Sequence, residues 1–170
     1  MHVHLKTSFG TITLELFPEK APKTVDNFLR YVRDGFYDGT IFHRVIDKFV
    51  IQGGGFGPNL TQKPPREPIE NESKNGLRNA RGTVAMARGS DVNSASSQFF
   101  INVIDNDFLN FTAPTQASCG YCVFGQVIDG MQIIDRINGV PTGSKQGFKD
   151  VPLNDVLIEK ATLAEKVDQH

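Results

Sequence analysis

The first residues of the chain alternate between polar and apolar side chains. From His2 to Phe17, apolar residues take every second position in two short stretches, with Ser8 to Gly10 between them. Period two is typical of strands that bury one face, and a polar segment with glycine is typical of a turn. The pattern therefore predicts a pair of adjacent strands joined near Ser8 to Gly10.

Two later stretches have the spacing of helices. In the first, apolar side chains recur at i, i+3, i+4 and i+7: Val25, Phe28, Leu29 and Val32. Pro22 suits the first turn of such a helix and Gly35 its end. A shorter helix is predicted from Met131 to Ile137, ending at Gly139.

Six more apolar runs have the length of strands and are bounded by turn residues. They cover residues 40–45, 49–52, 83–87, 98–103, 122–127 and 156–163. With the first pair this gives about eight strands and two helices. The helices do not alternate with the strands, so a doubly wound parallel sheet is disfavoured, and a mainly β antiparallel barrel or sandwich with two covering helices is expected.

Two segments do not fit this strand-rich pattern. Residues 53–81 are rich in Gly, Pro, Asn and charged residues, and residues 110–118 form a second irregular stretch. Long irregular segments in a small domain usually have a function. We expect both to be surface loops that wall a groove.

Length and charge narrow the class of protein. The 170 residues suit a single domain, predicted over residues 1–164 and followed by a polar tail at 165–170. The formal net charge is −1 and apolar runs are short, so a nucleic-acid or membrane partner is not expected. The first residues lack a signal-peptide core, which favours the cytoplasm. No heptad pattern is visible, and we expect a monomer.

Several kinds of catalytic or binding site fit poorly. Cys119 and Cys122 have the spacing of a redox or zinc motif, but no second pair and no following helix pattern accompany them. Gly53 to Gly55 lack the Lys-Ser/Thr of a phosphate loop, and no nucleophile elbow or metal-binding His pair is present. Neither a metal nor a cofactor is expected.

The most informative residues are polar side chains within apolar strands. His43 and Arg44 end one apolar run, Gln52 ends the next, and Gln98 begins another. Buried polar groups need hydrogen-bond partners, so these residues form either a structural network or a functional site. The residues alone leave both options open.

These same segments resemble the cyclophilin family of peptidyl-prolyl cis-trans isomerases over residues 2–163. Phe42-His-Arg-Val-Ile46, Phe49-Val-Ile-Gln-Gly-Gly54, Gln98-Phe-Phe-Ile101 and Val123-Phe-Gly125 match its motifs in order. The chain is most similar to small bacterial cytoplasmic members, because Asn106-Asp-Phe-Leu109 replaces a Trp-Leu pair. The resemblance implies a closed eight-stranded antiparallel β-barrel capped by two α-helices, acting on proline-containing peptides and protein clients.

The resemblance also implies which residues form the site. Arg44 matches the catalytic arginine, Gln52 the residue that supports it, and Phe108 the position at the pocket mouth where Trp is usual. The remaining matches bind substrate: Phe49, Met86, Phe100 and Leu109 around the proline ring, Ala87 and Arg88 along the substrate backbone, and His43, Gln98 and Tyr121 lining the site. Because Phe108 lacks the indole N–H, cyclosporin binding is expected to be weak.

Two other functions remain open at this point. A non-catalytic binder or chaperone for proline-containing chains would use the same aromatic groove. Gripping a ring needs no cation, however, so Arg44 favours catalysis. A hydrolase or a nucleic-acid binder finds no support in charge or motif.

Overall fold

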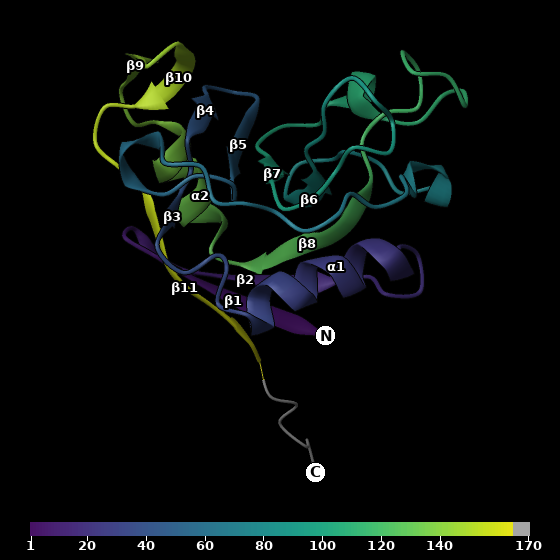
Figure 1. The fold of residues 1–170 in the computed structure, drawn as a ribbon, viewed down its shortest axis with the longest axis horizontal. Coiled ribbons are helices and arrows are strands. Elements are labelled where there is room, and N and C mark those ends of the chain that lie inside the picture. The colour runs from purple at the N-terminus through teal and green to yellow at the C-terminus, as the bar shows by residue number, and fades with distance from the viewer. Residues whose placement is uncertain (165–170) are drawn as a thin grey trace.

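Nine antiparallel strands form one continuous sheet in the computed structural model, which describes residues 1–164 (Figure 1). The predicted tail at 165–170 lies outside the described residues. The order in the sheet is β3-β11-β1-β2-β8-β6-β7-β5-β4. The bounds are β1 (His2–Thr7), β2 (Gly10–Leu16), β3 (Thr40–Ile41), β4 (Arg44–Ile46), β5 (Val50–Gly53), β6 (Thr83–Met86), β7 (Phe99–Asn102), β8 (Val123–Asp129) and β11 (Leu157–Leu163).

The sheet curls until its two edge strands almost meet. These edges, β3 and β4, are separated along the chain only by Phe42 and His43, and they form no ladder with each other. The sequence predicted a single strand at 40–45. Instead Phe42 donates its backbone N–H to Val156 O at 2.9 Å, and the chain passes from one edge to the other. The predicted mainly β, barrel-like fold with two helices is confirmed. The sheet has nine strands where about eight were predicted, and its edge strands β3 and β4 are connected by residues 42–43 without pairing by hydrogen bonds.

The structure also contains a separate hairpin that the sequence analysis did not predict. β9 (Thr142–Lys145) and β10 (Phe148–Pro152) pair only with each other. All residues of β9 and the first three residues of β10 are exposed or half-buried, so no apolar alternation marks them as strands.

Two helices pack on the curled sheet. α1 (Pro22–Arg33) contacts β11, and α2 (Met131–Asn138) contacts β2, β4 and β5. α1 has Pro22 in its first turn, as predicted, and the carboxylate of Glu72 accepts hydrogen bonds from the Thr24 N–H and hydroxyl at 2.7 and 2.8 Å. Within the described part of the chain, no helix combines the length and apolar character needed to cross a membrane.

Aromatic side chains fill the interior of the curled sheet. The ring of Phe28 on α1 lies 5.1–5.5 Å from those of Tyr37, Phe99 and Phe124. Each such side chain stabilises the fold by about 2–3 kcal/mol through burial. Because side chains alternate along a strand, Phe99 enters this core while its neighbour Phe100 faces the opposite side of β7.

The irregular segment at 53–81 contains two short 3₁₀ turns, η1 (Pro58–Leu60) and η2 (Ser73–Asn75), and isolated β-bridges at Phe56 and Ile69. Three of its polar side chains donate hydrogen bonds to backbone carbonyl oxygens of residues 119–123. These are Asn71 Nδ2 to Gly120 O (3.3 Å), Ser73 Oγ to Cys119 O (2.6 Å) and Asn75 Nδ2 to Val123 O (3.1 Å). The segment therefore fixes the backbone that leads into β8.

Candidate active site

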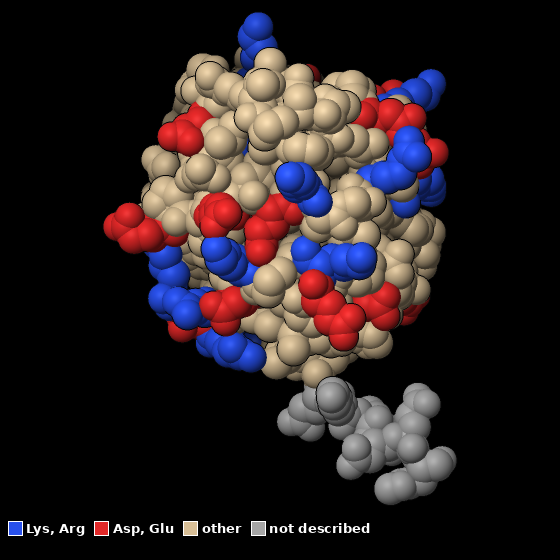
Figure 2. Space-filling model, turned by 90° about the vertical axis from the view of Figure 1, so that its right-hand side faces the viewer, with Lys and Arg blue, Asp and Glu red and all other residues tan. Residues whose placement is uncertain are grey.

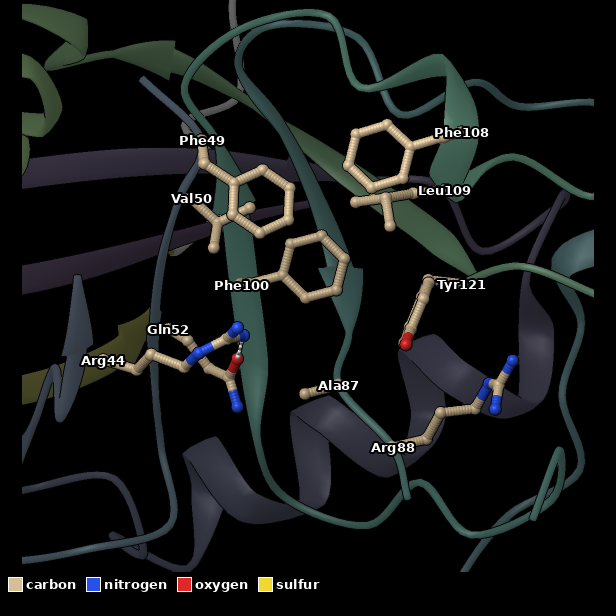
Figure 3. Close-up of a pocket in the computed structure, with 10 residues that line it drawn as sticks. All are labelled: Arg44, Phe49, Val50, Gln52, Ala87, Arg88, Phe100, Phe108, Leu109 and Tyr121. Atoms are coloured by element: carbon tan, nitrogen blue, oxygen red, sulfur yellow. Dashed lines mark hydrogen bonds between the residues drawn. The ribbon is translucent and has the colours of Figure 1, made fainter. Parts of the chain in front are cut away.

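A cavity of about 300 Å³ opens on the side of β5 and β7 that faces away from the aromatic core (Figure 3). Its walls come from β4, β5 and β7, the residues after β6, a short 3₁₀ turn η3 (Asp107–Leu109) and the segment before β8. The lining residues are Arg44, Phe49, Val50, Gln52, Ala87, Arg88, Phe100, Phe108, Leu109 and Tyr121.

Strand register explains why distant residues meet here. Arg44 on β4 pairs with Gln52 on β5, which in turn pairs with Phe100 on β7. Cross-strand partners lie side by side on one face of a sheet. The register thus places a cation, an amide and an aromatic ring in one row, as Figure 3 shows.

The floor and upper wall of the cavity are apolar. Phe100 is buried at its base and meets the Tyr121 ring edge-on at 5.6 Å. Phe108 on η3 is 74% exposed and stacks on Phe49 with ring centroids 5.6 Å apart. Together with Leu109 these rings form a slot suited to a flat, apolar ligand group.

Two amides fix the guanidinium of Arg44 on one side of this slot. Arg44 Nη1 donates to Gln52 Oε1 at 3.1 Å, and Gln52 Nε2 donates to Gln98 Oε1 at 3.0 Å. This chain of hydrogen bonds orients the planar cation and leaves its other N–H groups free for a ligand.

A second guanidinium stands across the cavity. Arg88 lies over the Tyr121 ring, with Cζ 4.7 Å from the centroid. Its Nε and Nη2 donate to Gly120 O at 3.2 and 3.1 Å. Ala87, between the two arginines, lines the lower edge of the cavity.

Three residues predicted to touch substrate do not line the cavity. Met86 is 2% exposed and belongs to the core cluster inside the sheet. Gln98 stands behind Gln52 as its hydrogen-bond acceptor. His43 is 5% exposed and packs against Phe56, with ring centroids 4.6 Å apart. Met86 ends β6 and His43 immediately precedes β4, and both side chains pack against residues outside the cavity.

His43 is neutral at ordinary pH. Burial, with a smaller contribution from the charge of Arg44, lowers the pKa of His43 from 6.5 to about 4. Its Nδ1 has no hydrogen-bond partner among the described residues. This position is that of a buried structural histidine beside the site.

Sequence reasoning missed Val50 in the lining and a buried asparagine network behind it. Asn106 Nδ2 donates to Phe49 O at 3.1 Å, and Asn79 Nδ2 donates to Leu109 O at 3.1 Å. Asn102 joins them, donating to Asn79 Oδ1 at 3.0 Å and accepting from Asn106 Nδ2 at 2.8 Å. The one available signal was Asn102, a polar residue ending the apolar run of β7.

The lining residues offer apolar surface, amide and phenol groups and two guanidinium cations. Among residues 1–164, no three His, Cys, Asp or Glu side chains cluster as metal ligands would. Cys119 and Cys122 are free thiols, and burial raises the pKa of Cys122 to about 11, which keeps that thiol protonated. The cavity instead combines an apolar slot with an oriented cation, which suits recognition of a ring and a neighbouring polar bond in a peptide.

Comparison with known proteins shows the family to which the chain is similar. The model of the family described as "Cyclophilin type peptidyl-prolyl cis-trans isomerase/CLD" matches residues 2–163. The chain is 55% identical to peptidyl-prolyl cis-trans isomerase B of Escherichia coli over 163 residues, which is 96% of this chain and 99% of that protein. It is 58% identical to the isomerase cyp18 of Streptomyces antibioticus over 161 residues, 95% of this chain and 97% of that one.

A solved structure shares the fold. A Cryptosporidium parvum cyclophilin, crystallised in the presence of the dipeptide Ala-Pro, superposes with a TM-score of 0.82 at 29% identity. The superposition covers 98% of this chain and 100% of that one. The chain therefore belongs to the cyclophilin family of peptidyl-prolyl cis-trans isomerases.

Proposed function

We propose that the cavity binds a proline-containing peptide with the proline ring in the slot over Phe100, and that Arg44 is the catalytic residue. The observation that carries this proposal is the guanidinium of Arg44, fixed by Gln52 at the side of an apolar slot. The crystallisation of a structural neighbour with Ala-Pro supports the choice of ligand.

The reaction requires rotation about one bond and no covalent chemistry. Amide resonance gives the prolyl bond a rotation barrier of about 18–20 kcal/mol, and uncatalysed exchange takes tens to hundreds of seconds. In the twisted transition state the proline nitrogen regains a lone pair, which the planar ground state lacks. A guanidinium N–H aimed at that nitrogen therefore binds the transition state more tightly than the substrate.

One hydrogen bond does not supply the whole acceleration. A rate of about 10³ per second requires about 7 kcal/mol at 1.36 kcal/mol per tenfold. A charge-assisted hydrogen bond contributes about 1.5–3 kcal/mol. We assign the remainder to the apolar slot, which holds the ring still and removes water that favours the charge-separated planar amide.

We extend the proposal to proline-containing segments of protein clients in the cytoplasm. Cyclosporin should bind weakly, because Phe108 at the mouth offers an aromatic face but no N–H donor. In a calorimetric titration we expect Phe108→Trp to bind this ligand more tightly than the wild type. Equal affinity would show that the missing donor is not the reason for weak binding.

The test of catalysis is NMR exchange between the cis and trans forms of a short Ala-Pro-Phe peptide. We expect wild type to accelerate exchange, and Arg44→Ala to bind the peptide without accelerating it. Arg44→Lys should also lose most of the activity, because an ammonium lacks the planar fork that Gln52 orients.

The folded state of each variant is checked by its NMR amide spectrum. Activity of a folded Arg44→Lys within about threefold of wild type, less than 1 kcal/mol of transition-state stabilisation, would contradict the proposed role. Binding without any acceleration by wild type would identify the cavity as a recognition groove.

A further inference from the structure

The cavity carries two cations and no carboxylate. Arg44 and Arg88 line it from opposite sides, and its other lining residues are uncharged (Figure 3). None of the ion pairs between described residues includes either arginine. Both positive charges are therefore uncompensated beside the place where a peptide would lie.

Arg88 is held in a fixed orientation by neutral partners. Its Nη1 donates to Gly89 O at 3.0 Å, its Nε and Nη2 share Gly120 O, and its plane lies over the Tyr121 ring. A guanidinium has five N–H groups, so two remain for a ligand. Because the side chain is already ordered, binding a carboxylate costs it little further entropy.

Nearby acidic residues have other partners. Asp91 accepts the Asn93 N–H at 2.9 Å. Asp107 on η3 lies 3.6 Å from Arg78. On the face drawn in Figure 2 acidic and basic side chains are interspersed, whereas this cavity contains charges of one sign only.

The surface beyond Arg88 extends the same groove. A second hollow of about 650 Å³ shares Arg88, Phe108 and Tyr121 with the first. Its further lining includes Gly89, Ser90, Gln116 and Ala117, which again contribute no acidic group. Arg88 thus stands where a bound chain would leave the proline slot and continue across the surface.

We propose that Arg88 is a specificity-determining residue that selects substrates with an acidic side chain next to the proline. This inference rests on the proposed function, since it assumes that the peptide occupies the slot beside Arg44. The carboxylate of the substrate would accept the two free N–H groups of Arg88, in a half-buried position where water screens the pair less than at an open surface.

The test compares acetyl- and amide-capped peptides that differ in one residue. Glu, Gln or Lys is placed directly before the proline in one series and directly after it in the other. NMR exchange gives kcat/KM and shift titration gives Kd for each peptide. We expect Glu to exceed Gln about threefold to fivefold in one series, which is about 0.6–1 kcal/mol at 1.36 kcal/mol per tenfold.

Variants separate this charge effect from the chemistry. In Arg88→Gln the Glu-to-Gln ratio should fall to about one, and in Arg88→Glu the Lys peptide should become the preferred one. The control Arg33→Gln removes the same charge from the exposed end of α1 and should keep the wild-type ratio. The preference should also weaken in about 1 M salt, where the Debye length is about 3 Å.

The outcomes distinguish the two proposals. Suppose that the Gln peptides are accelerated and that the Glu-to-Gln ratio is near one in both series, for kcat/KM and for Kd. This result would overturn the role of Arg88 and leave the isomerase mechanism intact. A preference that persists in Arg88→Gln would also overturn it. Preference in Kd without acceleration of any peptide would support Arg88 as a selector and contradict the proposed function.

Discussion

At the scale of single residues, the orientation of Arg44 depends on a row of amides that itself depends on a glycine. Gln98 fixes Gln52, and Gln52 fixes Arg44. A Cβ on Gly55 would lie 2.6 Å from Gln98 Cγ and 2.7 Å from its Nε2. The absence of a side chain at Gly55 therefore gives Gln98 its place.

Gly55→Ala should lower activity while leaving the fold in place. The new methyl group displaces a flexible side chain and not backbone, so Gln98 moves away and Gln52 loses its acceptor. We expect kcat/KM to fall about threefold to tenfold, or about 0.6–1.4 kcal/mol, with little change in melting temperature.

Gly57→Ala is the matched control, because a Cβ there would lie 3.8 Å or more from any residue other than its two chain neighbours. Both variants are compared by NMR exchange on the same peptide. If Gly55→Ala were as active as Gly57→Ala, the amide row would not be what orients Arg44.

At the scale of elements, the asparagine network connects the loops that form the apolar slot. It binds the carbonyl oxygens of Phe49 and Leu109, which lie on different segments of the chain. Neither η3 nor the turn before β5 has long regular structure of its own. The network therefore replaces a sheet ladder in holding the two walls together.

Asn102→Leu should weaken both stability and catalysis. The substitution keeps the volume but leaves Asn79 Oδ1 without its donor in a buried position. We expect the free energy of unfolding to fall by about 1–3 kcal/mol, the cost of a buried unsatisfied polar group. Catalysis should fall too, because Asn102 connects Asn79, which holds Leu109 O, to Asn106, which holds Phe49 O.

The control for this prediction is Asn27→Leu on α1. Asn27 is also buried and donates to Ser96 O at 2.7 Å, but it does not line the cavity. Denaturant unfolding and NMR exchange are measured for both variants. An equal loss of activity in the two would mean that catalysis simply follows global stability.

Much of this element structure was predictable because burial alternates regularly along the chain. Period two located β1 and β2, and the helical spacing from Val25 to Val32 located α1 together with its starting proline. The hairpin of β9 and β10 was not predictable in this way, because exposed strands carry no alternation. The division of the predicted strand at 40–45 depends on the long-range contact of Phe42 with Val156, which no local pattern records.

The site was predictable only in part. Polar residues in apolar strands pointed to Arg44 and Gln52, and the family motifs supplied the remaining candidates. Met86 and His43 were placed at the cavity because motif matching ignores which face of a strand a side chain takes. Asn79 and Asn106 lie in irregular segments where asparagine is common, so the sequence alone gave no reason to single them out.

At the scale of the whole molecule, stability comes from the apolar interior and not from surface charge. The ion pairs of the described residues are exposed; Arg81 and Asp135, for example, bond at 2.8 Å with side chains 46% and 47% exposed. Such pairs contribute about 0–1 kcal/mol each. Figure 2 accordingly shows charges of both signs distributed over the face that it draws.

His43 adds a pH dependence to the stability of the whole fold. Its pKa is about 4 in the folded state, against 6.5 for an exposed histidine. Below pH 6.5 the unfolded chain binds a proton at this residue that the folded chain does not bind. Its contribution to stability is therefore present above pH 6.5, falls as the pH drops towards 4, and is lost by about that pH.

At 1.36 kcal/mol per pKa unit the change across this window is about 3 kcal/mol. His43→Leu should abolish it, whereas His2→Leu, which removes an exposed histidine, should not. The measurement is urea unfolding of the three proteins at about pH 7.5 and about pH 4.5. The carboxylate of Asp135, which is paired in the fold, also loses stability in acid, but it does so equally in wild type and His43→Leu. The difference between wild type and His43→Leu therefore isolates the histidine. An acid loss of the same size in His43→Leu would show that this buried ring becomes protonated without strain, and that the fold opens in acid at another site.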